Sequence, residues 1–447
     1  MKAKKILIIS HNPISLKQNN GKTLKSFLND IPPQNIAQIY INGDYIDYDS
    51  CNIFFKINEL GIIKKSFIKK TNIGSVYENK GTDIKINYAN NKKNNLINNK
   101  SIGIRNTARN LSKRPFVEII RSFFWKRAKP IDDVLLRKFL DDFNPDVILY
   151  QTSNIAGYSD FVLNVKKYTN SELVLTITDD YLTRKYNFSI FDYYRTRELN
   201  KKYEECIKES KAVFVIGNKM MEEYRKKFPE GKYYIAMNTY DKTISSKEYK
   251  PKKNRFQILF AGNLGLSRWK TLVSLGKVLD SISTDFSIEL KICSLSNIDC
   301  KIKRSFEKIR CINFIGALDG DELRKEKENS DMLLHVESFN KKDKIVTRLS
   351  ISTKIYEYIN SNRCILAIGP SDVASIEYIK DNNLGYVLCS KKYNEWSAGL
   401  KNIIGNTNLL YKYIDNCRKF SVQHHDSKKN IKKIQNIIIG DGELEKK

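Results

Sequence analysis

Two cationic side chains lie beside short turns in the C-terminal half of this chain of 447 residues. Arg268 follows the Gly-Asn-Leu-Gly turn of FAGNLGLSRWKT, and Lys354 lies in LSISTKIYEY. Small residues let the backbone approach a ligand closely, and cations beside a helix start suit a diphosphate. The structural alternative for the first turn is a solvated pair of Arg268 and Lys270.

The segment LSISTKIYEY predicts a helix that begins near Lys354 and is capped by Ser352 or Thr353. A cation in the first turn opposes the helix dipole, so a specific need for the charge would explain its position. Glu357 lies three residues on, on the same face. Its carboxylate can accept hydrogen bonds from two vicinal hydroxyls, such as those of a ribose. The alternative is a surface pair of Lys354 and Glu357.

The N-terminal turn SHNPISLKQNNGKTL places Gly-Lys-Thr between an expected strand and an expected helix. A phosphate-binding P-loop needs another Gly five residues before Gly21, where this chain has Leu16, so we reject that motif. Asn20 and Gly21 remain at a helix N-terminus, where free N–H groups and the dipole can receive a phosphate or sugar oxygen. A tight structural turn is the alternative.

The elements that would position these residues follow an alternating pattern. Short, nearly continuous apolar runs alternate with amphipathic segments of helical length, which indicates parallel sheets covered on both faces. The expected strands are Ile6–Ser10, Ala37–Ile41, Val147–Tyr150, Leu173–Thr178, Ala212–Ile216, Gln257–Ala261, Ser287–Ile292, Cys311–Ile315, Met332–Val336, Cys364–Ile368 and Tyr386–Cys389. We therefore predict an α/β protein with two doubly wound Rossmann-like domains, which bind ligands in a cleft at the carboxyl ends of both sheets.

A polar stretch, Asp241–Arg255, separates the two series of strands. It has no apolar periodicity and contains a proline, so it predicts an interdomain linker. The expected boundaries are an N-terminal domain over residues 1–240, the linker over 241–255 and a C-terminal domain over 256–420. A final helix and tail over 421–447 complete the chain.

The chain carries 78 Lys and Arg against 50 Asp and Glu, a net charge of +28. That charge favours an anionic partner such as nucleic acid, an acidic membrane face or a phosphorylated small molecule, unless it reflects compositional bias toward Lys. Residues 91–130 hold +10 of it and end in Pro115–Lys129, which has phenylalanines at helical spacing. Such a helix either lies in an anionic membrane interface or packs its phenylalanines on the core.

The eight cysteines include no Cys-x-x-Cys pair, and the four histidines show no metal-ligand spacing. Scattered cysteines in a long chain suit a reducing cytoplasm. No stretch approaches the roughly 18 apolar residues that a spanning helix needs. We therefore expect a cytoplasmic protein, with peripheral contact at the inner face of the cytoplasmic membrane as a further expectation.

Five segments, taken in order along nearly the whole chain, resemble one enzyme family. They are SHNPISLKQNNGKTL, LVLTITDDY, FAGNLGLSRWKTL, LLHVESF and STKIYEYINSNRCILAIGP. Together they are similar to the family-four glycosyltransferases of the GT-B fold, especially bacterial enzymes of capsule, O-antigen and exopolysaccharide assembly. The resemblance implies an acceptor-side N-terminal domain, a nucleotide-sugar-binding C-terminal domain and a final helix that crosses back to the N-terminal domain.

For the donor site, the resemblance implies that Arg268 and Lys354 hold the diphosphate of a nucleotide-sugar. Glu357 would bind the ribose, and Gly21 would lie beside the phosphates and the transferred sugar. Cations and helix N-termini can neutralise a leaving diphosphate without a metal ion. We therefore expect no metal and no other cofactor.

For catalysis, the resemblance implies that Asp179 and Asp180 face the cleft on the acceptor side, and that Glu337 lies near the donor sugar. A helix cap or a turn is the structural alternative for the two aspartates. The family carries a pair of glutamates separated by seven residues. This chain has Leu349 at the first of those two positions, eight residues before Glu357, and Glu337 is the carboxylate that would replace it.

The activity implied by the resemblance is transfer of a sugar from a UDP-sugar to a cell-surface polysaccharide or lipid-linked glycan, with retention at the anomeric carbon. One alternative is a nucleotide-sugar epimerase or hydrolase of the same fold, which would turn over the donor without an acceptor. Another is a nucleic-acid-binding protein that uses the charge of +28. No aromatic-rich binding motif supports the last alternative, so we expect no nucleic-acid partner.

Overall fold

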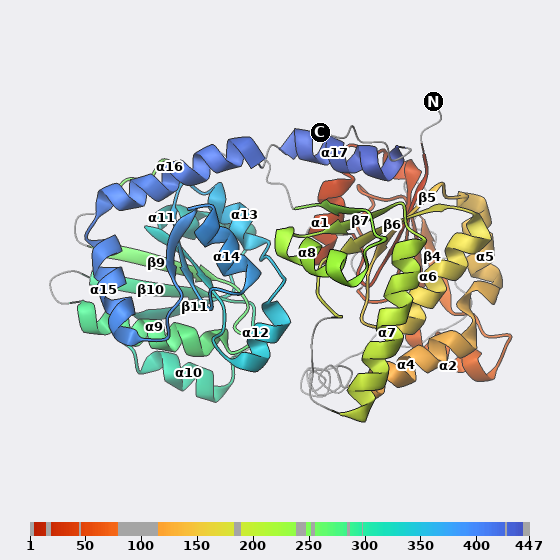
Figure 1. Cartoon of the computed structure of the whole chain (residues 1–447), viewed down its shortest axis with the longest axis horizontal. Helices are drawn as coiled ribbons and strands as arrows, with labels where there is room; N and C mark the ends of the chain where they lie inside the picture. The colour runs from red at the N-terminus through yellow and green to blue at the C-terminus, as the bar shows by residue number, and fades with distance from the viewer. Residues whose placement is uncertain are drawn as a thin grey trace. The chain divides into compact units, whose positions relative to one another are not determined.

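The protein is described here from a computed structural model. The structure describes residues 4–14, 19–43, 46–78, 115–182, 189–237, 247–251, 255–283, 287–296, 298–424 and 427–440. Residues 91–114 of the predicted basic segment, most of the predicted linker and the tail after residue 440 lie outside these ranges. The chain divides into two compact units (Figure 1): unit 1 is Met1–Met237 with Ile431–Lys447, and unit 2 is Asn238–Asn430.

Unit 1 is built on an eight-stranded sheet with the order β4-β3-β2-β1-β5-β6-β7-β8. Neighbouring strands are parallel except at the edge, where β4 runs antiparallel to β3. The strands are β1 (Ile6–Ser10), β2 (Ile36–Tyr40), β3 (Ile53–Ile57), β4 (Gly74–Glu78), β5 (Val147–Gln151), β6 (Glu172–Ile177), β7 (Ala212–Val215) and β8 (Tyr233–Ile235). The central strands β1, β2 and β5 are buried along their whole length, which is why they appear in the sequence as continuous apolar runs.

Helices cover both faces of this sheet. They are α1 (Asn19–Phe27), α2 (Glu59–Phe67), α4 (Pro115–Ala128), α5 (Val134–Phe143), α6 (Ala156–Thr169), α7 (Ile190–Lys208), α8 (Asn218–Lys227) and α17 (Ser427–Ile439), with short 3-10 turns at Pro33–Asn35 and Pro130–Asp132. Asp133 caps the start of α5, and its carboxylate accepts hydrogen bonds from the Leu136 and Ile73 N–H groups.

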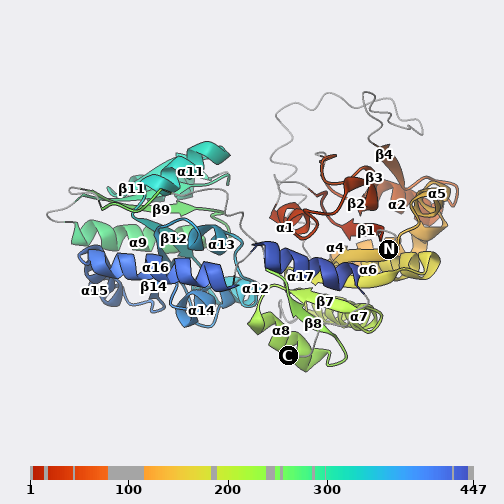
Figure 2. The ribbon, with the colours of Figure 1, turned by 90° about the horizontal axis from the view of Figure 1, so that it is seen from above.

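The last helix, α17, belongs to unit 1 from Ile431 onward, whereas its first turn and the helix before it belong to unit 2. Ile434, Ile437 and Ile438 of α17 are buried in one core cluster with residues of α1 and of the sheet, such as Phe27 and Phe214. Figure 2 shows α17 alongside unit 1, in agreement with this cluster. The change of unit falls between Asn430 and Ile431, so the preceding helix extends unit 2 beyond the predicted boundary at residue 420.

Unit 2 has a six-stranded sheet in which every pair of neighbouring strands is parallel, with the order β11-β10-β9-β12-β13-β14. Its strands are β9 (Arg255–Ala261), β10 (Ser287–Cys293), β11 (Ile312–Gly316), β12 (Met332–Val336), β13 (Cys364–Ile368) and β14 (Gly385–Leu388). Its helices are α9 (Arg268–Ile282), α10 (Cys300–Glu307), α11 (Gly320–Asn329), α12 (Lys341–Thr347), α13 (Lys354–Ile359), α14 (Ala374–Asp381), α15 (Tyr393–Ile404) and α16 (Thr407–His424).

The predicted fold class is confirmed, because each unit is a Rossmann-like α/β domain with a largely parallel sheet. In unit 2, one core cluster joins the strands to α9, α10, α15 and α16. The order of strands reverses between β9 and β12, which are neighbours in the sheet. In open parallel sheets, ligands bind at the carboxyl ends of the strands where the order reverses. The residues that follow β9 and β12 are therefore the first place to look for a site.

In the described part of the chain, no helix is both long and apolar enough to cross a membrane.

Candidate functional site

The carboxyl edge of the sheet in unit 2 brings Arg268 and Glu337 together. Arg268 is the first residue of α9, and a turn with left-handed residues at Leu266 and Ser267 leads into it. Glu337 directly follows β12. The Arg268 guanidinium donates to the Val336 carbonyl oxygen at 3.1 Å and to the two carboxylate oxygens of Glu337 at 3.0 and 3.2 Å. The cation predicted to bind a diphosphate is thus held at the end of β12.

The Glu337 carboxylate is buried, with 2% of the residue exposed. Burial by itself would raise the pKa of this carboxyl, but the neighbouring His335 ring and the Arg268 charge outweigh it and lower the pKa. His335 Nε2 lies 3.4 Å from Glu337 Oε1. Glu337 therefore stays ionised and fixes the direction of the Arg268 side chain. These contacts identify it as a residue that positions Arg268.

Lys354 lies beside this pair, at the start of α13. Its side chain is half-buried, and Nζ lies 6.0 Å from the centre of the Phe260 ring. Within the described ranges, Nζ has no hydrogen-bond or ion-pair partner. The charges of two neighbours nevertheless act on the pKa of Lys354, which Arg268 lowers and Glu357 raises. Gly262 makes room for it, because a Cβ at that position would overlap Lys354 Nζ.

The environment of Lys354 changes its protonation. Burial, followed by the positive charge of Arg268, lowers the pKa of Lys354 from 10.5 to about 8. A half-buried ammonium group without a counter-ion, next to a guanidinium, favours an anionic ligand that supplies the missing negative charge. The predicted caps of this helix differ from the structure, since the Thr353 side chain makes no capping hydrogen bond.

The surface pair of Lys354 and Glu357, given above as the structural alternative, does not form. Glu357 Oε2 accepts a hydrogen bond from Lys327 Nζ at 2.6 Å instead. Lys327 lies near the end of α11, and sequence reasoning missed it because α11 is highly polar and carries no motif. The structure thus gathers Arg268, Glu337, Lys354 and Glu357 in unit 2, with Lys327 as an added cation.

The other three predicted residues lie in unit 1. Gly21 is buried in the first turn of α1, as expected for a residue near a helix N-terminus. Asp179 and Asp180 follow β6. Asp179 is half-buried and accepts a hydrogen bond from the Tyr181 hydroxyl at 3.3 Å. Asp180 is 1% exposed and accepts from Leu182 N at 3.1 Å and from the Tyr224 hydroxyl at 3.4 Å.

These contacts give Asp180 a structural role that can be measured. Asp180→Ala is expected to lower the free energy of unfolding by about 1–3 kcal/mol, because the Leu182 N–H and the Tyr224 hydroxyl lose a buried acceptor. Asp179→Ala, the matched control, is expected to change it by less than about 0.5 kcal/mol. Urea denaturation of both variants tests this difference. An Asp180→Ala variant with unchanged stability and lost turnover would instead assign Asp180 to catalysis.

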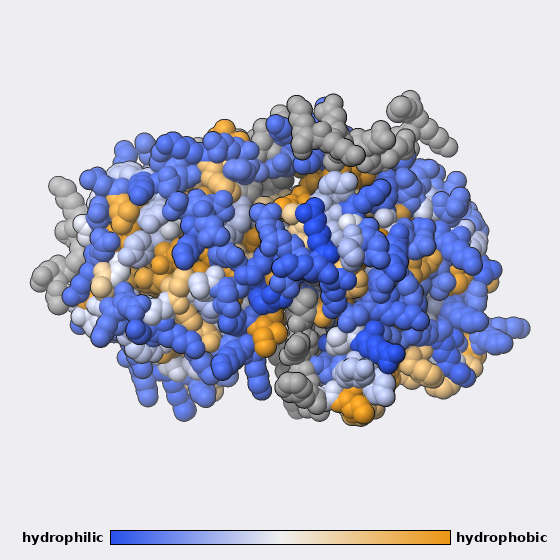
Figure 3. Space-filling view, viewed as in Figure 1, coloured by the Kyte–Doolittle hydropathy of each residue, from blue (hydrophilic) through white to orange (hydrophobic). Residues whose placement is uncertain are grey.

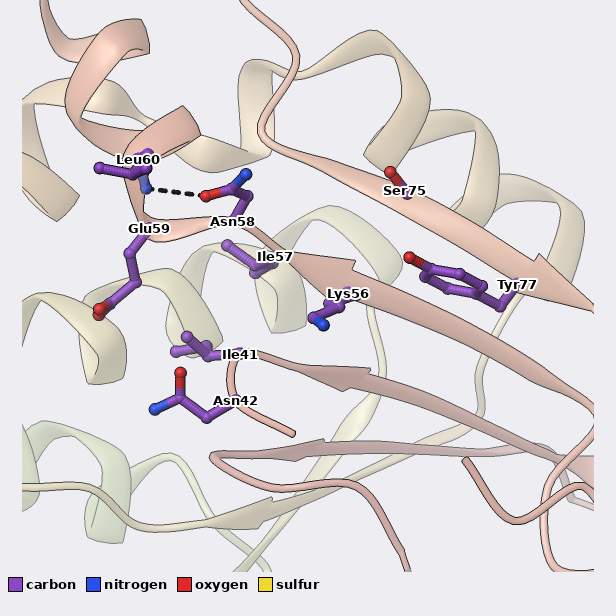
Figure 4. A pocket seen from close by; sticks show the side chains of 9 residues that line it. All are labelled: Ile41, Asn42, Lys56, Ile57, Asn58, Glu59, Leu60, Ser75 and Tyr77. Atoms are coloured by element: carbon purple, nitrogen blue, oxygen red, sulfur yellow. Dashed lines mark hydrogen bonds between the residues drawn. The ribbon is translucent and has the colours of Figure 1, made fainter. Parts of the chain in front are cut away.

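Unit 1 also contains a pocket that the sequence did not reveal. It has a volume of about 410 Å³ and lies at the carboxyl ends of β2 and β3, beside β4 and the start of α2. Figure 4 shows Asn42, Lys56, Glu59 and Tyr77 around it, and the Asn58 side chain that accepts from Leu60 N and caps α2. Neither β3 nor β4 was among the predicted strands, so their side chains could not be assigned to one place.

The described residues contain no group of three or more His, Cys, Asp or Glu side chains that could hold a metal ion. The positive charge at the carboxyl edge of the unit 2 sheet comes from Arg268, Lys354 and Lys327. The chemistry it can perform is the binding and neutralisation of a negatively charged group.

No protein-family model and no curated protein matches the chain. Solved structures do match its fold, and they are GT-B glycosyltransferases. A glycosyltransferase from Rickettsia africae is 14% identical over 99% of this chain and 100% of its own, with a TM-score of 0.60. HepE from Anabaena, solved in complex with UDP, is 10% identical over 97% and 98%, with a TM-score of 0.61.

Sucrose-phosphate synthase from Thermosynechococcus elongatus is 8% identical over 97% of this chain and 98% of its own, with a TM-score of 0.61. Identities this low show a shared fold. The likeness extends over both units of the chain, which supports the predicted pair of Rossmann-like domains.

Proposed function

We propose that this protein is a glycosyltransferase that moves a sugar from a UDP-sugar to a cell-surface polysaccharide or a lipid-linked glycan. The observation that carries the proposal is the pair of cations at the carboxyl edge of the unit 2 sheet. Arg268 is held in place by Glu337, and Lys354 lies next to it without a counter-ion of its own. A nucleoside diphosphate fits such a pair, and solved structures of the same fold contain UDP.

In the proposed reaction, a hydroxyl oxygen of the acceptor bonds to the anomeric carbon while the bond between the sugar and the diphosphate breaks. Negative charge develops on the diphosphate, which leaves and takes up the proton of that hydroxyl. Arg268 and Lys354 stabilise that charge. Glu337 acts by orienting Arg268, and the Glu357 carboxylate accepts hydrogen bonds from the ribose while Lys327 holds it. Gly21 and the neighbouring N–H groups of α1 would receive oxygens of the phosphates or sugar. We expect neither a metal ion nor another cofactor in this step.

Unit 1 is proposed to bind the acceptor, with its polar pocket as a place for a saccharide. Amide, carboxylate, ammonium and phenol groups around this pocket are those that bind sugar hydroxyls. We further propose a family-four enzyme of capsule, O-antigen or exopolysaccharide assembly, which retains the anomeric configuration and works at the inner face of the cytoplasmic membrane. The family, the acceptor and the retention rest on the sequence resemblance, and the location rests on the scattered cysteines and the basic segment over residues 91–130.

A panel of UDP-, GDP- and ADP-sugars tests the proposal with the full-length protein. We expect UDP to bind in calorimetry, and one UDP-sugar to release UDP in the presence of a glycan or lipid-linked acceptor, with the same rate in EDTA. Release of nucleotide without acceptor, or conversion of the donor sugar, would favour the epimerase or hydrolase alternative. If no nucleotide binds at millimolar concentration, the proposal is wrong.

A further inference from the structure

One region of unit 1 exposes many large hydrophobic side chains. Among the described residues, ten of the 18 large hydrophobic side chains that are exposed belong to α2, α4, the start of α7 or Ile68, which follows α2. Figure 3 shows hydrophobic residues at the edge of unit 1 that α4 and the start of α7 form. We call this region the aromatic surface and define it by Leu60, Phe67, Phe116, Phe123, Ile190 and Phe191.

The aromatic surface is continuous across three helices. Helix α4 packs against both α2 and α7. The rings of Phe67 and Phe124 lie 5.9 Å apart, and Phe124 lies 5.7 Å from Phe123 on the same helix. At the other end of α4, the rings of Phe116 and Phe191 lie 5.2 Å apart. Phe116 and Phe123 are seven residues apart, about two helical turns, so they occupy one side of α4.

The rotation of α4 that exposes these phenylalanines is fixed by polar contacts on its other side. Glu118 is buried and accepts from Arg195 of α7 at 3.1 Å, and Arg195 also binds Asp192 at 3.1 Å. The Ser122 hydroxyl accepts a hydrogen bond from Gly157 N of α6 at 2.9 Å. Rotating α4 to bury its phenylalanines would break this buried ion pair, which is strongly unfavourable.

Of the two alternatives that the sequence left open for α4, packing of its phenylalanines on the core does not hold for Phe116 and Phe123, which are 51% and 56% exposed. The core side of α4 carries Glu118, Ser122 and Trp125 instead.

Basic residues surround the aromatic surface, and the acids near it are neutralised. The described residues 59–70 and 115–129 each carry a net charge of +3. Glu59 is bound by Arg121, and Glu198 is bound by Lys126. Within residues 59–70, 115–129 and 190–197, the exposed cations that have no ion-pair partner among the described residues are Lys64, Lys69, Lys70, Arg127, Lys129 and Arg197. A positive rim around exposed aromatic residues matches an anionic lipid surface.

We propose that the aromatic surface binds the interface of an anionic lipid bilayer, with Phe67, Phe116, Phe123 and Phe191 inserted among the lipid headgroups. A second copy of the chain fits this surface less well, because a two-fold contact would place the same positive rims against each other. Membrane binding would bring the protein to a lipid-linked acceptor, so the purpose of this surface rests on the proposed function. The evidence for the surface itself does not depend on that function. Vesicle binding tests it separately from sugar transfer.

Flotation of the full-length protein with vesicles tests the inference. We expect binding to phosphatidylcholine vesicles that contain phosphatidylglycerol, and at least about tenfold weaker binding to phosphatidylcholine alone. The double variant Phe67→Asp/Phe123→Asp is expected to bind at least about tenfold more weakly than the wild type, with an unchanged melting temperature, because both side chains are exposed. The matched control Leu295→Asp/Val422→Asp changes two exposed residues of unit 2 and should bind like the wild type.

A charge variant, Lys64→Gln/Lys69→Gln/Lys70→Gln, should weaken binding by about tenfold or more and reduce its dependence on salt. Equal losses in the aromatic variant and the unit 2 control would overturn the proposal, as would failure of the wild type to bind anionic vesicles. Light scattering provides a further outcome. A wild-type dimer that the aromatic variant converts to a monomer, without vesicle binding, would assign the aromatic surface to self-association.

Discussion

Replacing Arg268 by alanine is expected to lower kcat for sugar transfer by about 10²–10³-fold. The reason is that Arg268 is the cation that Glu337 and the Val336 carbonyl hold in a fixed position at the end of β12. A preorganised donor aimed at developing charge stabilises the transition state more than the bound substrate. The loss should therefore be larger in kcat than in the affinity for UDP. Rates of UDP release at saturating donor, together with calorimetry of UDP, separate the two quantities.

Lys270→Ala is the matched control for this variant. Lys270 belongs to the same first turn of α9, but it is exposed and lies 5.7 Å from the Trp269 ring. Its removal should change kcat by less than about threefold, as for a surface substitution away from a site. Arg268→Lys keeps a charge but loses the planar fork whose Nε donates to the Val336 carbonyl while Nη2 donates to Glu337, so it should recover only part of the activity.

Two outcomes would contradict the role of Arg268. If Arg268→Ala retained full kcat toward the preferred donor, Arg268 would not stabilise the leaving group. If Lys270→Ala were equally slow, the effect would come from general loss of positive charge. Removing Arg268 leaves the buried Glu337 with His335 as its neighbour, so unfolding of the variant is measured alongside its kinetics.

The sequence predicted the sheets best where the strands are buried on both faces. Met332–Val336 and Cys364–Ile368 were predicted with the bounds that the structure has, because their apolar runs are continuous and end at polar or small residues. The edge strand β4 was missed, since none of its residues is buried. Strand β3, next to β4, includes two half-buried positions, so its apolar pattern was less distinct. Both strands contribute residues to the unrecognised pocket of unit 1.

The sequence predicted those residues of the candidate site that a pattern in their immediate neighbourhood marks. Arg268 and Lys354 each stand beside a helix start that follows a turn, and this pattern identified them. Lys327 could not be found in this way, because its contact with Glu357 spans 30 positions and no local pattern marks it. The side of α4 that faces the core could not be predicted from the sequence either, because it depends on the ion pair between Glu118 and Arg195, which is 77 positions away.

Loss of UDP affinity above pH 8 is the second large effect that we expect. Burial and the Arg268 charge lower the pKa of Lys354 to about 8 in the free protein, and a bound diphosphate must raise it. Below pH 8, Lys354 is protonated both in the free protein and in the complex. Its titration therefore adds no pH dependence to UDP binding in this range. Above pH 8 the free protein has lost the proton, and binding must recover it. The Kd therefore increases by up to about tenfold per pH unit until the pKa of the complex is reached.

Between pH 7.5 and pH 9.5 this linkage predicts a Kd for UDP that rises about 20-fold in the wild type. The diphosphate is almost fully ionised above about pH 7, so its own titration adds little over this range. Lys354→Met should bind UDP about 10–100-fold more weakly at pH 7.5, the loss of a hydrogen bond between charged groups, and should show no such rise. Isothermal titration at several pH values measures both.

A flat profile for the wild type, or the same rise in Lys354→Met, would place the titrating group elsewhere. Gly262→Ala provides a second check that leaves the charge in place. Its Cβ would overlap Lys354 Nζ and push the ammonium group away from the turn after β9. If the diphosphate binds there, this variant loses affinity while the inflection near pH 8 moves toward the ordinary pKa of lysine, because a displaced ammonium group is better solvated. One added methyl group at residue 262 would thus change both the affinity for UDP and the pKa of Lys354. If Lys354 had only a structural role, its pKa could change but the affinity for UDP would not.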